Sequence, residues 1–316
     1  MTAPEVISLG SVNLDFQVRA DRWPEPGETM AARDFHMLGG GKAANVAVVA
    51  RRLGVPTRLV AHLGDDVLRE TALAALRACG VDLCLTRTVA RRATGLAFIT
   101  VRADGSKSIV LAANANDEWT PQDADAAASA VSAADPGSVL VADLEVPVSV
   151  VQRTLQAAQA RGCTVIVDPS PADRLTEDLF PLIDFLTPNP AEARRLTGVT
   201  VSSVQDAFQA GKTLLERGVR TALVKLGDGG CVVVSAGVRG HIPAPPVTVV
   251  DTTGAGDAFA GALAVALIEG RLVADAATFA VAAATFSVKK YGAQPSYPSR
   301  PELDAFMQQH RLDATA

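Results

Sequence analysis

Short apolar runs alternate with longer amphipathic runs along most of the chain. After residue 121 the order is regular, with helical spacing of apolar residues in the longer runs. Strands that alternate with helices predict a mostly parallel sheet covered by helices on both faces, which is an α/β fold. The expected elements are helices over 122–131, 148–160, 191–196 and 204–217, and strands over 139–143, 164–168, 183–187 and 222–226.

The two ends of the chain continue this pattern. The first third predicts a strand over 6–10, a helix over 43–53, a strand over 57–62 and a helix over 67–79. The last third predicts a small antiparallel addition, followed by two long apolar helices. These elements lie over 231–234, 239–242, 258–268 and 274–288.

Two stretches, about 16–38 and 85–113, do not follow the alternation. Short strands are expected there over 17–19, 30–36, 97–101 and 108–111, the last two around a turn at 103–106. Both stretches are therefore interpreted as excursions from one domain that covers residues 1–316. They either pair as a small β-sheet lid over a site or form separate surface hairpins.

Composition and charge narrow the possible partners. The chain is 48% hydrophobic and 20% charged, as is usual for a globular protein, and its net charge is −5 without a basic tract. Nucleic acid and an anionic membrane surface are therefore not expected as partners. The N-terminal residues lack signal-peptide architecture, and none of the four cysteines forms a C-x-x-C pair. A cytoplasmic protein with reduced thiols is expected.

The stretch from Asp251 to Phe259 carries the clearest chemistry. Gly254 and Gly256 permit close approach of a ligand to the backbone, and a helix follows immediately. The free N–H groups and the dipole at such a helix start attract phosphate. We therefore interpret Asp257 as a base that accepts the proton of a substrate hydroxyl while the N–H groups stabilise a transferring phosphoryl group. The alternative is that Asp257 only complements the helix dipole.

Residues 39–45 form a second glycine-rich helix start. Lys42 and Asn45 project donors beside Gly41, an arrangement that suits the hydroxyl groups of a sugar. The alternative is a turn with a solvated lysine. Neither glycine stretch is a P-loop or a dinucleotide fingerprint, because Ala43 follows Lys42 and Phe259 occupies the third glycine position.

The stretch DTTGAGDAF resembles the signature of the PfkB (ribokinase-like) carbohydrate kinases, in which the last Asp is the catalytic base. GGGKAAN resembles the GGKGAN element of the ribokinases in that family, with Ala43 in place of a glycine. The family's N-x-D, L-E-x-P and N-x-x-E elements also occur in family order. The resemblance runs from Gly10 to about Phe306 and implies a ribokinase-like α/β fold with a small β-sheet lid.

The resemblance also implies roles for individual residues of this chain. The catalytic group would be Asp257 with the anion-binding residues Gly254, Ala255 and Gly256. The sugar would be bound by Asn13, Asp15, Gly41, Lys42, Asn45, Glu145 and Asp257. Asp143, two residues before Glu145, has no assigned role.

The resemblance also assigns residues to the nucleotide and the metal ions. ATP and Mg²⁺ would be held by Asn189, Glu192, Lys225, Gly227, Gly230 and Gly256. Asn189 and Glu192 also match an ordinary helix cap, and Lys225 is either paired with ATP phosphates or solvated. An activating K⁺ would be bound by Asp251, Thr253, Ser287, Gly292 and Ser296.

The family implies an ATP-dependent kinase that transfers the γ-phosphate to a primary hydroxyl of a sugar. D-Ribose is the expected acceptor and ribose 5-phosphate the expected product. The alternatives are another acceptor, such as a nucleoside, fructose or 2-keto-3-deoxygluconate, or a sugar-binding sensor without catalysis. Related kinases often dimerise through lid strands, so a homodimer through the lid is expected.

Overall fold

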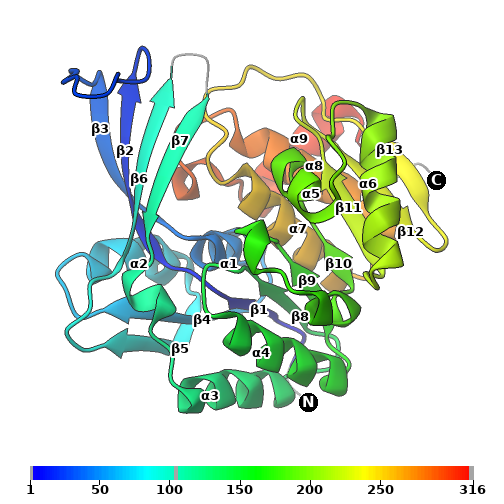
Figure 1. Ribbon diagram of the computed structural model, residues 1–316. Coiled ribbons are helices and arrows are strands. Elements are labelled where there is room, and N and C mark those ends of the chain that lie inside the picture. Colours follow the sequence, from blue (N-terminus) through cyan, green and yellow to red (C-terminus); the bar gives the residue numbers. More distant parts are fainter. Residues whose placement is uncertain (1–2, 103–105, 313–316) are drawn as a thin grey trace.

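A large sheet forms the centre of the molecule. The computed structural model describes residues 3–102 and 106–312 (Figure 1). Its large sheet has the strand order β13-β12-β11-β10-β9-β8-β1-β4-β5, parallel from β5 to β11 and antiparallel beyond. These strands are β1 Val6–Leu9, β4 Thr57–Gly64, β5 Asp82–Val89, β8 Val139–Ala142, β9 Thr164–Val167, β10 Phe185–Leu186, β11 Thr221–Lys225, β12 Cys231–Ser235 and β13 Arg239–Ile242.

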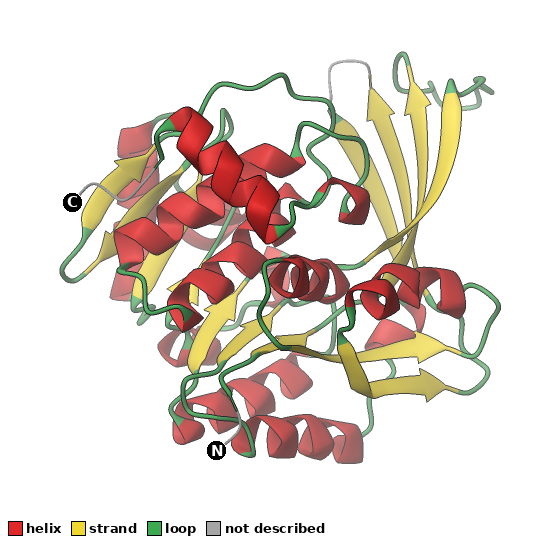
Figure 2. Cartoon of the chain, turned by 180° about the vertical axis from the view of Figure 1, so that it is seen from behind, coloured by secondary structure: helices red, strands yellow, loops and turns green. Residues whose placement is uncertain are grey.

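Helices cover both faces of this sheet (Figure 2). One buried cluster joins the sheet to α1, α2, α7, α8 and α9, and a second joins it to α3, α4, α5 and α6. The helices are α1 Lys42–Arg52, α2 Arg69–Cys79, α3 Pro121–Ser132, α4 Val148–Arg161, α5 Pro190–Thr197, α6 Val204–Glu216, α7 Ala255–Ile268, α8 Val273–Ser287 and α9 Arg300–His310, and the 3₁₀ turns are Asn114–Asp117, Ala172–Arg174, Glu177–Leu182 and Gln294–Ser296.

The local sequence explains where several helices begin and why two of them are buried. Thr120 and Asp123 form a reciprocal capping box at the start of α3, with Pro121 in the first helical position. Helices α7 and α8 are apolar around most of their circumference and lie against each other in the core. The start of α7 is consequently held in place by packing along the length of that helix.

A second, four-stranded sheet is separate from the large sheet, and one end of it lies against α1 and α2 (Figure 1). Its order is β3-β2-β6-β7, with β2 and β6 parallel and the outer strands antiparallel to them. Ala97, Ile99 and Val101 are buried on one face, while Phe35 and Phe98 on the other face are exposed. The strands are β2 Asn13–Ala20, β3 Asp34–Gly40, β6 Gly95–Arg102 and β7 Lys107–Ala112.

The predicted α/β class, with its mostly parallel sheet, surrounding helices and small separate sheet, is confirmed. One boundary is wrong: residues 85–89 belong to β5 at the edge of the large sheet, so only β6 and β7 come from the predicted excursion at 85–113. None of the residues of β5 is fully buried, and polar residues such as Thr86, Arg87 and Thr88 interrupt its apolar positions, unlike a buried parallel strand. The strand expected over 30–36 lies at Asp34–Gly40. The turn expected at 103–106 falls mainly outside the described residues.

The longest apolar helices are core elements. Across residues 3–102 and 106–312, no helix combines the length and the apolar character needed to cross a membrane.

Candidate active site

The start of α7 presents free backbone donors to a large cleft. Gly254 is the N-cap residue and has a φ of 76°, which favours glycine. No side chain caps this helix start, and the N–H groups of Gly256 and Asp257 have no acceptor among the described residues. The hydroxyl of Tyr297 donates to the carbonyl of Gly254 at 3.2 Å. The helix start at which the sequence predicts anion binding therefore has free donors.

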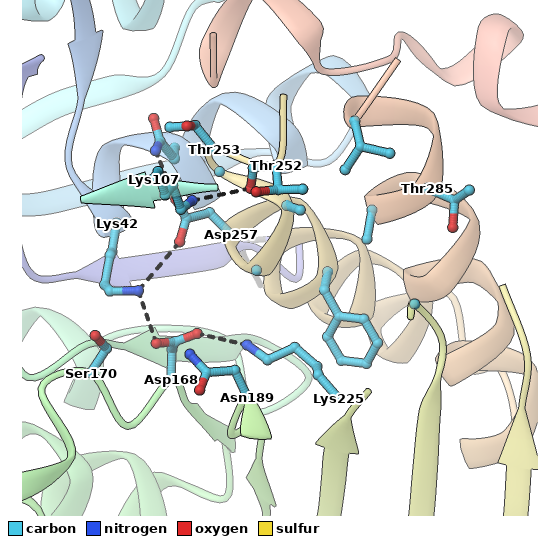
Figure 3. A pocket seen from close by; sticks show the side chains of 18 of the residues that line it. Lys42, Lys107, Asp168, Ser170, Asn189, Lys225, Thr252, Thr253, Asp257 and Thr285 are labelled. Carbon is cyan, nitrogen blue, oxygen red and sulfur yellow. Dashed lines mark hydrogen bonds and ion pairs between the residues drawn. The ribbon is translucent and has the colours of Figure 1, made fainter. Parts of the chain in front are cut away.

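The cleft lies between the carboxyl ends of the parallel strands and the small sheet. Its volume is about 1130 Å³, and residues of both sheets line it. Ile109 and Leu111 of β7 form part of the wall, and the starts of α1 and α7 form another part. Figure 3 shows side chains from these segments that meet around Asp257.

Asp257 is the buried carboxylate at the centre of this cleft. Its Oδ2 accepts a hydrogen bond from Nδ2 of Asn45 at 2.7 Å, and its Oδ1 lies 3.8 Å from Nζ of Lys42. Burial raises the pKa of Asp257, and the nearby Lys42 opposes that shift. The structure thus brings together three residues that the sequence assigned to the same reaction.

A carboxylate that the sequence motifs did not single out connects two lysines. Oδ1 of Asp168 lies 3.1 Å from Nζ of Lys42, and its Oδ2 lies 3.2 Å from Nζ of Lys225 (Figure 3). Although burial opposes ionisation, Lys225 and Lys42 lower the pKa of Asp168 to about 2. Burial disfavours the charged form of Lys42, but the carboxylates of Asp168 and Asp257 outweigh it and raise the pKa of Lys42. Lys225 is therefore paired within the site rather than solvated.

The end of the cleft near β2 has further polar side chains. Nδ2 of Asn13 donates to Oε2 of Glu145 at 3.4 Å, and its Oδ1 accepts from Nδ2 of Asn116 at 2.8 Å. Asn116 also bonds the backbone N–H and carbonyl of Val12, so it fixes the orientation of Asn13. Asn116 lies in a 3₁₀ turn outside any motif, and no sequence pattern marked it.

Asp15 differs from its neighbours because its carboxylate accepts no hydrogen bond from the described part of the chain. It lines the cleft and is 6% exposed. Burial, with the charges of Asp257 and Glu145, raises the pKa of Asp15 to about 7. A carboxylate that faces a cavity without a protein partner suits a ligand that brings hydroxyl donors.

Asp143 has a structural role. Its Oδ2 accepts from the N–H of Ser11 at 3.0 Å, and its Oδ1 accepts from the N–H of Glu145 at 2.8 Å. Burial and the neighbouring Glu145 raise the pKa of Asp143. Asp143 therefore joins the loop after β1 to the loop after β8, which carry Asn13 and Glu145.

The backbone at Gly41 explains the glycine before α1. Gly41 is the N-cap residue with a φ of 90°, and a Cβ there would lie 2.6 Å from the carbonyl oxygen of Ser11. The hydroxyl of Ser11 in turn accepts a hydrogen bond from the N–H of Lys42 at 2.9 Å. These close contacts bring Lys42 and Asn45, on the first turn of α1, to the cleft.

The predicted nucleotide residues line the other end. Asn189 and Glu192 form a capping box at the start of α5, in which each side chain accepts from the other's backbone N–H. Lys225, Gly227 and Gly230 lie at the hairpin between β11 and β12. The remainder of this end is largely apolar, with contributions from Pro245, Pro246, Val247, Val281, Ala284 and Val288.

The loop before α7 is organised by Asp251. Its Oδ1 accepts from the N–H of Thr253 at 2.8 Å, and its Oδ2 accepts from the N–H of Gly292 and from Nε2 of Gln17, both at 2.9 Å. Gln17 belongs to β2, so the small sheet contacts this loop directly. Lys107 of β7 makes a second contact, from its Nζ to the carbonyl of Thr252 at 3.3 Å.

The hydroxyls predicted to bind K⁺ have different surroundings. The hydroxyl of Ser287 donates to the carbonyl of Ala284 in its own helix, and that of Ser296 donates to the carbonyl of Ala293. The hydroxyl oxygen of Thr253 is buried and has no partner in the described chain. The side-chain oxygen of Gln17 is likewise buried and unpartnered there.

Known proteins share this arrangement of elements and motifs. The family model for pfkB family carbohydrate kinases matches residues 3–300. A ribokinase of Haemophilus influenzae is 36% identical over 300 residues, which are 95% of this chain and 97% of that protein. A deoxyribokinase of Salmonella typhi is 31% identical over 304 residues, or 96% of this chain and 98% of that protein.

Solved structures agree with the sequence relatives. The structure of Arabidopsis thaliana ribokinase complexed with ribose and ATP matches with a TM-score of 0.84 at 33% identity, over 99% of this chain and 100% of that one. The expected resemblance is thus confirmed over nearly the whole length of the chain. The chain belongs to the pfkB family of carbohydrate kinases.

Proposed function

We propose that the protein is an ATP-dependent kinase that transfers the γ-phosphate to the primary hydroxyl of D-ribose and yields ribose 5-phosphate. The observation that carries this proposal is the position of Asp257. This buried carboxylate lies at the open N-terminus of α7, in one cleft with Asp15 and Asn13. A base for an alcohol and donors for a phosphoryl group are thereby adjacent. The ribose and ATP bound to the Arabidopsis thaliana ribokinase support the two substrates.

The reaction follows from these positions. Asp257 accepts the proton of the primary hydroxyl as that oxygen bonds to the γ-phosphorus, and the bond from phosphorus to the β,γ-bridging oxygen breaks to release ADP. The N–H groups of Gly256 and Asp257 stabilise negative charge on the transferring group. Asn45 holds the orientation of Asp257 through its hydrogen bond.

The sugar would occupy the end of the cleft near β2 and α1. Asp15 accepts from ribose hydroxyls, since its carboxylate has no competing hydrogen bond in the described structure. Asn13 and Glu145 would hydrogen-bond neighbouring hydroxyls. Asn116 holds the side chain of Asn13, and Asp143 holds the backbone of Glu145. Gly41 permits the sugar to approach the backbone before α1.

ATP would extend from the start of α7 toward the hairpin between β11 and β12. The apolar end of the cleft would accommodate the adenine ring of ATP, and Lys225 would face the phosphates. Mg²⁺ bound to the triphosphate would neutralise its charge. Glu192 and Asn189 line the cleft, and their side-chain oxygens suit Mg²⁺ through its water shell, which this ion gives up reluctantly.

A monovalent cation such as K⁺ would bind beside Asp251. The unpartnered buried oxygens of Thr253 and Gln17 support this part of the proposal, because both residues also hydrogen-bond Asp251. Gly292, whose N–H donates to Asp251, and Ser296 would lie on the same loop region. The charge of the cation would favour binding of phosphate at the start of α7. The hydroxyl of Ser287 already donates to a carbonyl within α8. Any contact of this segment with K⁺ would therefore come from backbone carbonyls after Ser287.

The exposed face of the small sheet would bind the same face of a second copy. Phe16 pairs with Met37 on one side and with Phe98 on the other, and Phe98 pairs with Val110. This row of apolar residues crosses all four strands. Phe35, Phe98 and Val110 are 56%, 50% and 65% exposed. A flat apolar patch of this kind is typical of a two-fold interface.

The proposed location is the cytoplasm, because the proposed substrate ATP is available there.

Release of ADP with ATP, Mg²⁺ and K⁺ tests the proposed substrates. Ribose should be phosphorylated at O5, while fructose, a nucleoside and 2-keto-3-deoxygluconate should be poor acceptors. 2-Deoxyribose should lose about a hundredfold or more in kcat/KM, if its missing hydroxyl leaves Asp15 or Glu145 unpaired.

Substitution of the base tests the mechanism. Asp257→Asn should remain folded and lose about three orders of magnitude or more in kcat, because its amide cannot accept the hydroxyl proton. Phosphoryl transfer at the wild-type rate by a folded Asp257→Asn protein would contradict the assignment. Failure of the wild-type protein to phosphorylate any of the sugars would contradict the function.

A further inference from the structure

Asp168 lies between two lysines that come from opposite sides of the cleft. Asp168 directly follows β9, Lys42 is the first residue of α1, and Lys225 is the last residue of β11. The side chains of Asp168, Lys225 and Lys42 are 5%, 14% and 21% exposed, so solvent screens their charges weakly. We call these three residues the lysine bridge (Figure 3).

The two ends of the lysine bridge reach different parts of the proposed reaction. Nζ of Lys42 lies 3.8 Å from the carboxylate of Asp257, the proposed base. Nζ of Lys225 lies 3.2 Å from the place that a Cβ on Gly256 would take, so it faces the anion-binding start of α7. Asp168 therefore connects the side that removes a proton with the side that receives the phosphate.

We propose that Asp168 is a positioning residue that keeps Lys42 from pairing closely with Asp257 and holds Lys225 over the start of α7. This inference rests on the proposed kinase function. Asp168 also offsets one positive charge, which limits how tightly the triphosphate is held before transfer. Binding that is equally strong before and during transfer does not raise kcat, so this restraint favours turnover.

Asp168→Asn should separate binding from turnover. The site loses one negative charge, so its net charge becomes more positive. The affinity for the ATP analogue AMP-PNP should therefore rise about three- to tenfold, with a smaller rise for ADP. Lys42 loses its nearest carboxylate and pairs with Asp257, so kcat with ribose should fall about ten- to a hundredfold. A residue with only a structural role would lower both affinity and kcat.

A second substitution tests whether the charges act as a unit. Lys225→Thr should weaken AMP-PNP binding more than ADP binding, because it removes the cation at the start of α7. The double variant Asp168→Asn, Lys225→Thr restores the charge balance and should bind AMP-PNP within about threefold of the wild type. Its kcat should stay low, since Lys42 still lacks Asp168.

Asp184→Asn is the matched control. Asp184 is also a buried, paired aspartate: it accepts from the N–H of Val165 at 2.8 Å and lies 2.8 Å from Arg220. Asp184 precedes β10 and so lies at the amino ends of the parallel strands, whereas Asp168 lies at their carboxyl ends. Its substitution should lower the thermal midpoint of unfolding and leave both kcat and the AMP-PNP affinity unchanged.

Calorimetric titration of the folded wild type and variants, together with steady-state kinetics, decides the matter. Equal kcat for wild type and Asp168→Asn would overturn the inference. Weaker AMP-PNP binding by Asp168→Asn that extra Mg²⁺ restores would overturn it as well, and would place a metal ion at Asp168. A wild type that binds AMP-PNP but does not phosphorylate ribose would refute the proposed function instead, since the affinity ratios of the variants are measured without turnover.

Discussion

Asp257 and Asp15 are buried carboxylates in the same cleft, yet their surroundings differ. Asp257 accepts a hydrogen bond from Asn45 and lies near Lys42, whereas Asp15 has no donor within the described residues. The pKa of Asp257 is raised by burial against the charge of Lys42. The pKa of Asp15 is raised to about 7 by burial and by neighbouring carboxylates. The two groups should therefore affect different kinetic constants.

The pH dependence of sugar binding follows from Asp15. Because its pKa is raised to about 7, the carboxylate is ionised above that pH and becomes protonated as the pH falls through it. The KM for ribose should be constant above about pH 7 and should rise below it, by up to about tenfold per pH unit. Steady-state kinetics across this range would measure the change.

Asp15→Asn provides the control for this pH dependence. An amide does not titrate, so the variant should bind ribose more weakly at every pH but without the rise toward acid. The KM for ATP should not share the dependence on Asp15. A wild-type KM for ribose that stays constant between about pH 5.5 and 8.5 would refute this role.

Residues in motifs could be assigned from the sequence, whereas their supporting residues could not. Lys42, Asn45 and Asp257 meet in the structure as their motifs predicted. Asp168 was missed because an aspartate after a strand is common in βα loops. Its partners lie 126 and 57 residues away along the chain. Asn116 was missed because its partners, Asn13 and Val12, are also distant along the chain, and only these contacts reveal its role.

At the scale of elements, the start of α7 depends on a residue from the C-terminal part of the chain. Tyr297 is buried, and its hydroxyl holds the carbonyl of Gly254. The same carbonyl accepts from the N–H of Ala258 at 2.9 Å. Tyr297 thus helps to fix the peptide planes that aim the free N–H groups at the cleft.

Tyr297→Phe should weaken this support without disrupting the fold. The lost hydrogen bond should lower the free energy of unfolding by about 1 kcal/mol, because Gly254 retains its helical partner. The kcat should fall several-fold, about three- to tenfold, since the N–H groups are less well oriented. Thermal unfolding and ribose phosphorylation would measure the two effects.

Tyr291→Phe is the matched control for Tyr297→Phe. The hydroxyl of Tyr291 is buried but has no hydrogen-bond partner in the described structure, so its removal should leave both stability and kcat near the wild type. An equal loss of kcat in the two variants would indicate a general effect of removing a phenol. The role of Tyr297 would then be refuted.

The loop at Asp251 predicts a response to monovalent cations. K⁺ should raise kcat/KM several-fold over a buffer with choline alone, because bound charge beside the loop favours phosphate at α7. Asp251→Asn should lose this response and should also lose the rise in thermal midpoint that K⁺ gives the wild type. Equal turnover with and without K⁺ would contradict the cation site.

At the scale of the whole molecule, the regular part of the fold was easier to predict than the small sheet. Continuous apolar runs marked the buried parallel strands, and helical spacing marked the helices around them. β5 was assigned in part to the excursion because this exposed edge strand lacks the continuous apolar run that marked the buried parallel strands. The pairing of β2 with β6 joins segments about eighty residues apart, and only the folded chain reveals such pairing.

The exposed face of the small sheet predicts a dimer in solution. A combined Phe35→Ser, Phe98→Ser variant should dissociate more readily, with a Kd at least about a hundredfold higher, because it loses the stacked rings at the centre of the face. Sedimentation equilibrium would measure the change.

Val67→Ser is the control for the dimer prediction. Val67 is 89% exposed and lies on the loop before α2, outside the apolar row of Met37, Phe16, Phe98 and Val110. Its replacement should leave the association unchanged. A wild-type protein that remains monomeric at micromolar concentration would refute the dimer.

Strand β2 carries both Asp15 and Gln17, and the two side chains lie on the same face of the small sheet. Asp15 borders the proposed sugar end, while Gln17 holds Asp251 in the loop that leads into α7. A shift of this strand on binding of the proposed sugar should therefore reach the loop before α7 through Gln17, two residues along the chain from Asp15. An empty acceptor pocket should consequently leave that loop imperfectly arranged, which would protect the cell from futile splitting of nucleotide by water.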